Sequence, residues 1–286
     1  MTDLFGAKQL RSLVPGLIAL CEEAGETICE HYHAPGADLF EAKGDDSPLT
    51  RADLASDTVL TKGLATLEPC LPILSEESAP QDPAIRRAWP RYWLVDPLDG
   101  TKEFLSRTGE FTINIALIEQ HRAVLGVLYL PLERVAYIGI PGLGAWRSEP
   151  GDDRWDAVAL RTRSLQAGDP LLVLASRRHR GERLQNCLEW LQSQWQPIER
   201  HNSGSALKFC QMVEGRGDFY PRYVPCCEWD TAAGQALLEG AGGALLGLNG
   251  EPLRYNCQDS LYSPNFYGIS DTNHPLWQAL VANDQF

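Results

Sequence analysis

Five apolar, β-rich segments follow one another between residues 71 and 140, and no other feature of the chain restricts the fold as strongly. Segments of this length that are rich in β-branched and aromatic residues are typical of strands. Because short connections join antiparallel neighbours, this succession predicts an antiparallel or mixed sheet. The predicted strands cover residues 71–74, 91–95, 111–118, 125–129 and 135–140.

Two amphipathic helices are predicted before these strands, over residues 10–31 and 53–67, because apolar residues recur there at helical spacing. The segment 148–168 is polar and contains turn-forming Pro, Gly and Asp residues, so we expect a sub-domain boundary near it. We therefore predict an N-terminal α+β sub-domain over residues 1–150 and a C-terminal α/β sub-domain over residues 165–286.

Strand-like and helix-like segments alternate in the C-terminal part of the chain, which favours an α/β arrangement there. The last predicted helix begins with Asp230 or Thr231 as its N-cap and ends at a glycine-rich stretch. The predicted elements are a strand over 171–176, helices over 183–194 and 205–214, a strand over 218–220 and a helix over 230–239.

The 286 residues carry a formal charge of −13 at pH 7, which disfavours nucleic-acid polymers as partners. A small anionic substrate remains compatible with this charge if metal ions intervene. Residues 1–9 do not resemble a signal peptide, and no apolar run of about 18 residues predicts a membrane-spanning helix. The eight cysteines show no C-x-x-C pair and no zinc-ligand spacing, which is typical of reduced thiols. We predict a cytoplasmic protein and leave open both peripheral attachment to the inner face of the membrane and the oligomeric state.

The segment 93–104 carries the strongest chemical signal. An apolar strand delivers Asp96, Pro97 turns the chain, and Asp99 opens what should be a helical turn. Two carboxylates three residues apart beyond a strand can converge on one point, and hard oxygen ligands suit Mg²⁺. The backbone N–H groups of Gly100 and Thr101 could hold a phosphate at the helix start. Taken alone, the same segment is also typical of an acidic turn with an N-cap.

Further acids accompany this segment. Glu76 and Glu77 follow another apolar strand, and Asp230 stands at a predicted helix start. Each has an ordinary alternative, since Glu76 and Glu77 fit a solvated loop and a carboxylate at a helix start is often only a cap. Acids crowded together without metal would repel one another, so a converging set predicts bound cations.

Residues 76–78, 93–104 and 229–234, in this order along the chain, resemble the inositol monophosphatase superfamily. The resemblance extends over nearly the whole chain. Within the superfamily, the chain is most similar to the bacterial CysQ-type 3'(2'),5'-bisphosphate nucleotidases. The residues that carry this closer similarity are 47–53, 92–96, 109–118 and 205–210.

This resemblance implies a layered αβαβα sandwich with its site between the two halves. It implies two or three Mg²⁺ ions held by Glu76, Asp96, the backbone carbonyl of Leu98, Asp99 and Asp230. Thr101 would orient the attacking water, with Glu76 near it as the base or as an acceptor on the metal side. Asp53 and Glu77 would lie in the metal shell or just behind it, with Asp53 among the catalytic residues.

The implied substrate is adenosine 3',5'-bisphosphate, released as AMP and phosphate, with 3'-phosphoadenylyl sulfate as a further substrate. From the residues alone, Arg177, Arg178 and Arg180 fit a solvated face, Lys208 a helix surface and Tyr220 the core. The resemblance implies that the substrate is bound by Leu98, Asp99, Gly100, Thr101, His179, Ser205, Lys208, Arg222 and Asp230.

Two alternatives stay open at this point. An inositol monophosphatase or a broad sugar-phosphate phosphatase would share the metal site. A catalytically silent, metal-binding regulatory protein would be expected to lack a ligand or Thr101, and this chain retains all of them. The stretch before Trp229 contains Cys226, Cys227 and Glu228, where we expect a more polar, cysteine-poor sequence. Glu228 would either add a charge beside the site or face solvent.

Overall fold

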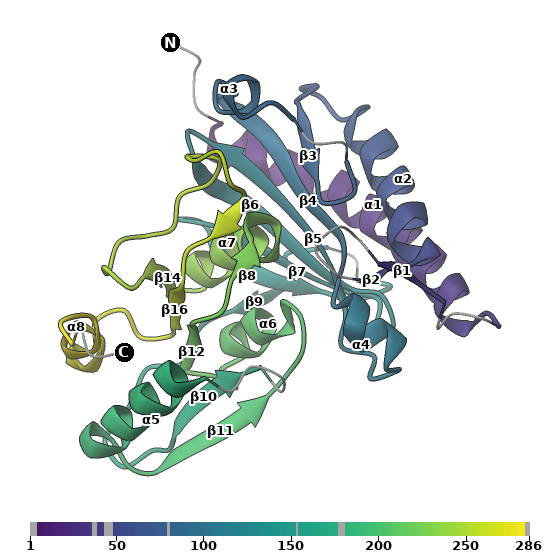
Figure 1. Ribbon diagram of the computed structural model, residues 1–286. Coiled ribbons are helices and arrows are strands. Elements are labelled where there is room, and N and C mark those ends of the chain that lie inside the picture. The colour runs from purple at the N-terminus through teal and green to yellow at the C-terminus, as the bar shows by residue number, and fades with distance from the viewer. Residues whose placement is uncertain are drawn as a thin grey trace.

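The structure is a computed structural model that describes residues 5–35, 39–42, 48–78, 81–152, 154–176 and 181–283. Figure 1 shows helices and sheets stacked in alternating layers. The predicted strands and helices are confirmed apart from shifts at their ends.

The larger sheet has seven strands in the order β3-β4-β5-β6-β7-β8-β9. β3 and β4 run parallel, whereas all later neighbours are antiparallel, so the prediction of an antiparallel or mixed sheet is confirmed as mixed. The strands are β3 (Ile73–Ser75), β4 (Arg91–Asp99), β5 (Thr112–Glu119), β6 (Arg122–Leu130), β7 (Val135–Ile140), β8 (Gly144–Ser148) and β9 (Val158–Leu160).

Helices α1 (Ala7–His33) and α2 (Arg51–Leu64) cover one face of this sheet. The buried side of α1 includes Leu17 and Cys21, at the helical spacing that predicted it. α2 begins two residues before the predicted start, because Thr50 caps it. The remaining short elements of the N-terminal part are β1 (Glu41–Ala42), β2 (Pro48–Leu49), α3 (Pro83–Arg86) and α4 (Thr101–Leu105).

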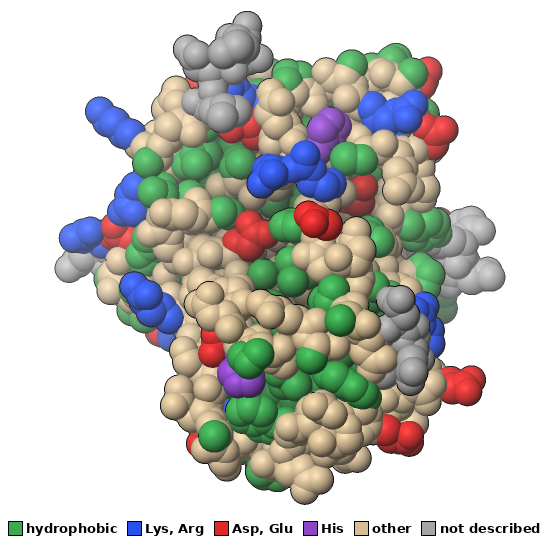
Figure 2. All heavy atoms as spheres, turned by 90° about the vertical axis from the view of Figure 1, so that its left-hand side faces the viewer, with side chains coloured by type: hydrophobic (Ala, Val, Ile, Leu, Met, Phe, Trp, Pro, Cys, Tyr) green, Lys and Arg blue, Asp and Glu red, His purple; other side chains and the backbone are tan. Residues whose placement is uncertain are grey.

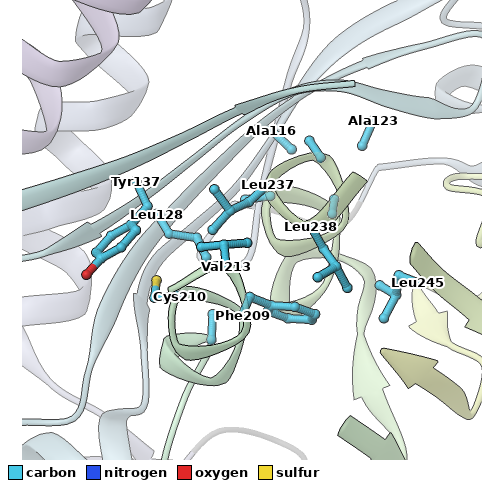
Figure 3. Close-up of a cluster of buried hydrophobic side chains, with 14 of the residues drawn as sticks. Ala116, Ala123, Leu128, Tyr137, Phe209, Cys210, Val213, Leu237, Leu238 and Leu245 are labelled. Atoms are coloured by element: carbon cyan, nitrogen blue, oxygen red, sulfur yellow. The ribbon is translucent and has the colours of Figure 1, made fainter. Parts of the chain in front are cut away.

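The opposite face of the larger sheet packs against α7 (Ala232–Gly240) and α6 (Leu207–Val213). Figure 3 shows Leu128 and Tyr137 of the sheet directed toward the helices that carry Leu237 and Val213. α7 lies so close to the sheet that a Cβ at Gly139 would meet the Leu237 Cα at 2.1 Å. The middle helical layer is therefore in direct backbone contact with β7.

The smaller sheet has the strand order β11-β10-β12-β16-β14 and is also mixed. Its outer face is covered by α5 (Glu182–Gln194) and α8 (Pro275–Val281). α8 buries Trp277 against Phe219, so this C-terminal helix packs on the hydrophobic core beside the smaller sheet. The strands are β10 (Leu171–Ala175), β11 (Ile198–Asn202), β12 (Phe219–Arg222), β14 (Ala244–Gly247) and β16 (Phe266–Ile269), with η1 (Glu228–Asp230) and the small pair β13 (Cys226–Cys227) and β15 (Tyr262–Ser263) beside them.

These layers confirm the predicted αβαβα sandwich: α1 and α2, the larger sheet, α6 and α7, the smaller sheet, then α5 and α8. The larger sheet extends to Leu160 through β9, and the smaller one begins at Leu171, so the division at residues 150 and 165 stays a prediction. On the face seen in Figure 2, Lys and Arg side chains lie beside Asp and Glu side chains rather than in one large patch of single charge. Within the described part of the chain, every helix is too short or too polar to cross a membrane.

Replacing Gly139 by alanine tests the close contact between α7 and β7. The added methyl has no space against Leu237, so we expect the free energy of unfolding to fall by about 1–3 kcal/mol. Denaturant unfolding measures this change. Gly268→Ala, in β16, is the control, because a Cβ there would lie 3.3 Å from both the Met212 sulfur and the Tyr220 Cβ, rather than 2.1 Å from backbone, and should cost less. Equal losses in both variants would contradict the proposed contact.

Candidate active site

Asp96 and Asp99 share one face of β4 because the strand bulges between them. Asp96 pairs with Asn114 of β5, and Asp99 pairs with Thr112, so three steps on β4 match two steps on β5. In a regular strand, residues three apart point to opposite faces. The extra residue of the bulge brings both carboxylates to the same side. The Leu98 N–H donates to Asp96 Oδ1 at 3.0 Å and holds that side chain in place.

The chain turns sharply after Asp99, at Gly100. Gly100 has a φ of 98°, and a Cβ there would lie 2.9 Å from the Glu110 carbonyl oxygen. Only glycine combines this left-handed backbone with such close packing. Thr101 then begins α4, which confirms the predicted helical turn.

Asp230 joins these two residues from the other end of the chain. It is the last residue of η1, directly before Thr231, the N-cap of α7. Its Oδ2 accepts a hydrogen bond of 3.0 Å from the Cys227 N–H. One carboxylate oxygen from each of Asp96, Asp99 and Asp230 lies within 4.8 Å of the others, and we call these three residues the carboxylate cluster.

The carboxylate cluster is electrostatically suited to cations. Burial raises the pKa of Asp96 well above its usual value, and the charges of Glu76, Asp99 and Asp230 raise it further. Burial likewise raises the pKa of Asp99 to about 6 and that of Asp230 to about 7. Buried carboxylates that destabilise one another's charged forms are stabilised by a divalent cation, and their oxygens are the ligands that Mg²⁺ prefers. The donor set therefore fits a metal centre.

Asp53 lies behind this cluster and contacts Thr101. The carboxylate of Asp53 is 2% exposed and accepts hydrogen bonds from the Thr50 N–H and hydroxyl. The Thr101 hydroxyl donates to Asp53 Oδ1 at 3.0 Å and lies 3.4 Å from the Leu98 carbonyl oxygen. The same residue that completes the N-terminal cap of α2 thus fixes the orientation of the Thr101 hydroxyl.

A loop over residues 203–206 closes the other side of the site. Its Ala206 N–H donates to Asp99 Oδ2, and its Gly204 N–H donates to Glu110 Oε2 at 2.8 Å. Ser205 adopts a left-handed φ of 41°, which is uncommon for a residue other than glycine and is typical of functional loops.

The side chain of Lys208 hydrogen-bonds to the backbone of this loop. It is 2% exposed, and its Nζ donates to the carbonyl oxygens of Ser203 at 3.1 Å and Ser205 at 2.7 Å. The interpretation of Lys208 as a helix-surface charge is therefore wrong. Burial and the Arg222 charge lower the pKa of Lys208 to about 8, while the Asp99 charge raises it.

A cavity of about 430 Å³ opens over the carboxylate cluster, and we call it the active-site cavity. It lies between the larger sheet and the 203–206 loop, and Arg222 and Tyr220 contribute to its wall from β12. The sequence-predicted residues that line it are Glu76, Asp96, Leu98, Asp99, Gly100, Thr101, Ser205, Lys208, Arg222 and Asp230.

The predicted residues differ in how they relate to the carboxylate cluster and the cavity. Glu76 lines the cavity but is not one of the three acids within 4.8 Å of one another. Asp53 contacts Thr101 without lining the cavity. His179 falls outside the described residues, as do Arg177, Arg178 and Arg180.

Glu228 does not face solvent, so that expectation is wrong; it lies behind the cavity wall in η1, two residues before Asp230. It is 5% exposed and accepts a hydrogen bond of 2.7 Å from the Asn256 N–H. The Asn256 side chain also hydrogen-bonds to the buried Arg86. Glu228, Asn256 and Arg86 therefore form a buried polar cluster that holds η1 in place. Sequence reasoning missed Arg86 and Asn256, because their pairing spans 170 residues and no local pattern marks it.

The family model described as the inositol monophosphatase family matches residues 9–284. The chain therefore belongs to the inositol monophosphatase family. The 3'(2'),5'-bisphosphate nucleotidase CysQ of Salmonella typhimurium is 43% identical over 86% of this chain and 95% of that protein. The protein of the same name from Escherichia coli K12 is 42% identical over the same shares of the two chains.

Solved structures agree with this assignment. CysQ from Bacteroides thetaiotaomicron, itself described as a bacterial member of the inositol monophosphatase family, has 35% identity and a TM-score of 0.77, covering 91% of this chain and 98% of that one. An IMPase from Thermotoga maritima has 21% identity and a TM-score of 0.74, covering 95% and 97% of the two chains, and shows the shared fold.

Asp96→Asn should have opposite effects on stability with and without metal. Asparagine keeps an oxygen for the Leu98 N–H but removes the repelling charge, so without divalent ions the melting temperature should rise, by about 2–4 °C for each kcal/mol gained. Wild type should be stabilised by Mg²⁺, by about 2.7 kcal/mol at a hundred times the dissociation constant, and the variant should not. Thermal unfolding with and without Mg²⁺ measures both effects.

Asp259→Asn is the control for charge removal, since the Asp259 side chain is 76% exposed. It should leave the stabilisation by Mg²⁺ unchanged. A wild-type response to Mg²⁺ in Asp96→Asn would show that the carboxylate cluster is not the binding site.

Proposed function

We propose that the chain is a Mg²⁺-dependent phosphomonoesterase that hydrolyses the 3'-phosphate of adenosine 3',5'-bisphosphate to AMP and phosphate. The observation that carries the reaction type is the carboxylate cluster beside the buried Lys208 and the half-buried Arg222 in one cavity. The choice of a nucleotide is supported by the curated nucleotidases at 42–43% identity. Such an activity removes a by-product of sulfate assimilation, and 3'-phosphoadenylyl sulfate is a further proposed substrate.

The proposed metal ligands are Asp96, Asp99, Asp230, the Leu98 carbonyl and Glu76. The first three form the carboxylate cluster, and the charge of Glu76 acts on Asp96 across the same cavity. When bound there, two or three Mg²⁺ ions would neutralise the charge of the phosphate and of the attacking and leaving oxygens. Glu77 is proposed to stand behind this shell.

Thr101 is proposed to position the attacking water. Its hydroxyl hydrogen points to Asp53, so its oxygen lone pairs are available to accept a hydrogen bond from water in the cavity. The water oxygen forms the new bond to phosphorus as the bond from phosphorus to O3' breaks. The proton released by water passes toward Thr101 and Asp53, with Glu76 as the alternative acceptor, and the leaving O3' gains a proton from solvent.

The second half of the chain supplies the positive charge that an anionic substrate requires. The Arg222 guanidinium lines the cavity and is held by the Val224 carbonyl at 3.2 Å. Arginine stays charged and presents a planar set of donors that matches phosphate oxygens. We propose that Arg222, Lys208 and Ser205 bind the nucleotide, together with the N–H groups of Gly100 and Thr101 and with His179.

The second candidate is an inositol monophosphatase activity. It is favoured by the family fold, which structures of inositol monophosphatases share at TM-scores above 0.7. The two candidates place the same demands on the carboxylate cluster and differ in the alcohol that the rest of the cavity must accept.

Phosphate release from adenosine 3',5'-bisphosphate and from inositol 1-phosphate separates these candidates. We expect Mg²⁺-dependent release with preference for the nucleotide, and no release in excess chelator. Asp99→Asn should lower kcat/KM by on the order of 10²-fold or more, since a lost ligand removes several kcal/mol of charge stabilisation. Asp259→Asn serves as the control. Preference for the inositol ester would move the assignment to the second candidate, and unchanged activity in chelator would overturn the metal-dependent mechanism.

Thr101→Val tests the positioning of water. Valine keeps the shape of threonine but has no hydroxyl, so we expect kcat to fall by about 10²–10⁴-fold with little change in the stabilisation by Mg²⁺. Thr101→Ser retains the hydroxyl and should keep most of the activity. Steady-state kinetics on the nucleotide measures both variants. If the valine variant retained the wild-type kcat, Thr101 would have no part in the chemical step.

A further inference from the structure

Tyr262 lies at the mouth of the active-site cavity on β15. This strand pairs antiparallel with β13, and Tyr262 stands directly opposite Cys227. Directly paired residues in such a ladder project from the same face. Both side chains line the cavity, and Cys227 is also the residue whose N–H holds Asp230. Tyr262 therefore lies on the strand that pairs with β13, and β13 leads directly into η1 and Asp230.

The Tyr262 ring is exposed to an unusual degree for a residue in a binding cavity. Its exposed fraction is 58%, and of the large apolar side chains that the described residues leave exposed, Tyr262 is the one that lines this cavity. In the described part of the chain, its hydroxyl has no hydrogen-bond partner and its ring packs on no other ring. A flat aromatic face is thus open to the cavity mouth.

The other aromatic side chains around the cavity are already engaged. Tyr220 packs edge-on against Phe209 at 5.4 Å and against Phe266 at 5.2 Å between ring centroids. Lys208 Nζ lies 5.1 Å from the Tyr220 ring centroid. Trp229 lines the cavity and packs against the core between the two sheets. These rings are parts of the cavity wall, whereas Tyr262 is free to meet a ligand.

We propose that Tyr262 is a specificity-determining residue that stacks on the base of the nucleotide. The inference rests on the proposed function, because it assigns the base of the substrate to that ring. Any purine or pyrimidine offers a flat π-face, whereas an inositol or sugar phosphate does not. Tyrosine has two side-chain torsions, so ordering it costs little entropy. With the ester phosphate at the carboxylate cluster, the 430 Å³ cavity has the size of typical small-ligand sites and room for the rest of the nucleotide.

The test compares Tyr262→Ala with wild type in the presence of Mg²⁺ on two substrates. One is adenosine 3',5'-bisphosphate, and the other is its abasic analogue, 1-deoxyribose 3,5-bisphosphate, which has the same phosphates and no base. We expect the variant to raise KM for the nucleotide by about 5- to 150-fold, the range for loss of one base–aromatic stack. The KM for the abasic analogue and the kcat for both substrates should stay unchanged. The affinity for AMP, measured by calorimetry, should fall by a similar factor.

Three control variants make the result specific. Tyr262→Phe and Tyr262→Trp keep a stacking face and should retain the nucleotide KM within about threefold, because stacking does not need the hydroxyl. Ile85→Ala removes another side chain that is 58% exposed but lies outside the cavity, and it should change neither KM.

The outcomes separate this inference from the proposed function. If wild type releases no phosphate from adenosine 3',5'-bisphosphate, the proposed function is wrong. If wild type is active but Tyr262→Ala has an unchanged nucleotide KM, the stacking role alone is overturned. An equal rise of KM for the nucleotide and for the abasic analogue would also overturn it, since the ring would then act on the sugar or on the shape of the cavity.

Discussion

Mutual repulsion among three closely spaced, buried or half-buried carboxylates is the physical constraint that the structure around the cavity has to meet. Asp96, Asp99 and Asp230 come from segments more than 130 residues apart, yet their oxygens lie within 4.8 Å of one another. Each accepts one backbone N–H, from Leu98, Ala206 and Cys227 respectively. These backbone donors hold the three carboxyl groups close together although their charged forms repel one another, and a bound cation would relieve that repulsion.

The 203–206 loop joins the two parts of the chain beside this cluster through hydrogen bonds of its backbone. Asp99 and Glu110 belong to the N-terminal part, and both accept N–H groups of the 203–206 loop. Lys208 satisfies two carbonyl groups of the same loop from the C-terminal side. Charged side chains from both parts of the chain therefore hydrogen-bond to the backbone of this one loop, which links this wall of the cavity to the position of Asp99.

Much of the architecture could be predicted from the sequence, because the information was local. The spacing of Leu17 and Cys21 marks the buried face of α1, and the apolar run before Asp96 marks β4. β11, β14 and β16 were not predicted, because each has only four or five residues and depends on partners distant in sequence. α8 buries its apolar residues only against strands that precede it by many residues.

The candidate site shows the same division between local and long-range information. The acids could be identified from their motifs and from family resemblance. The bulge that turns Asp96 and Asp99 to one face could not, because it exists only in the register between β4 and β5. The burial of Lys208 and the open ring of Tyr262 likewise depend on packing between segments that no spacing rule connects.

The contact between Gly139 and α7 has a consequence for how such a scaffold can diversify. α7 begins just after Asp230, and at Gly139 its backbone lies directly against β7 with no side chain between them. α7 is therefore packed tightly on the larger sheet. Asp96 and Asp99 lie on β4 of the larger sheet and Asp230 lies just before α7, which packs on that sheet, while Arg222 and Tyr220 lie on the smaller sheet. Substitutions in the smaller sheet can therefore alter the cavity wall around Arg222 and Tyr220 while the backbone donors of Asp96 and Asp230 stay in place.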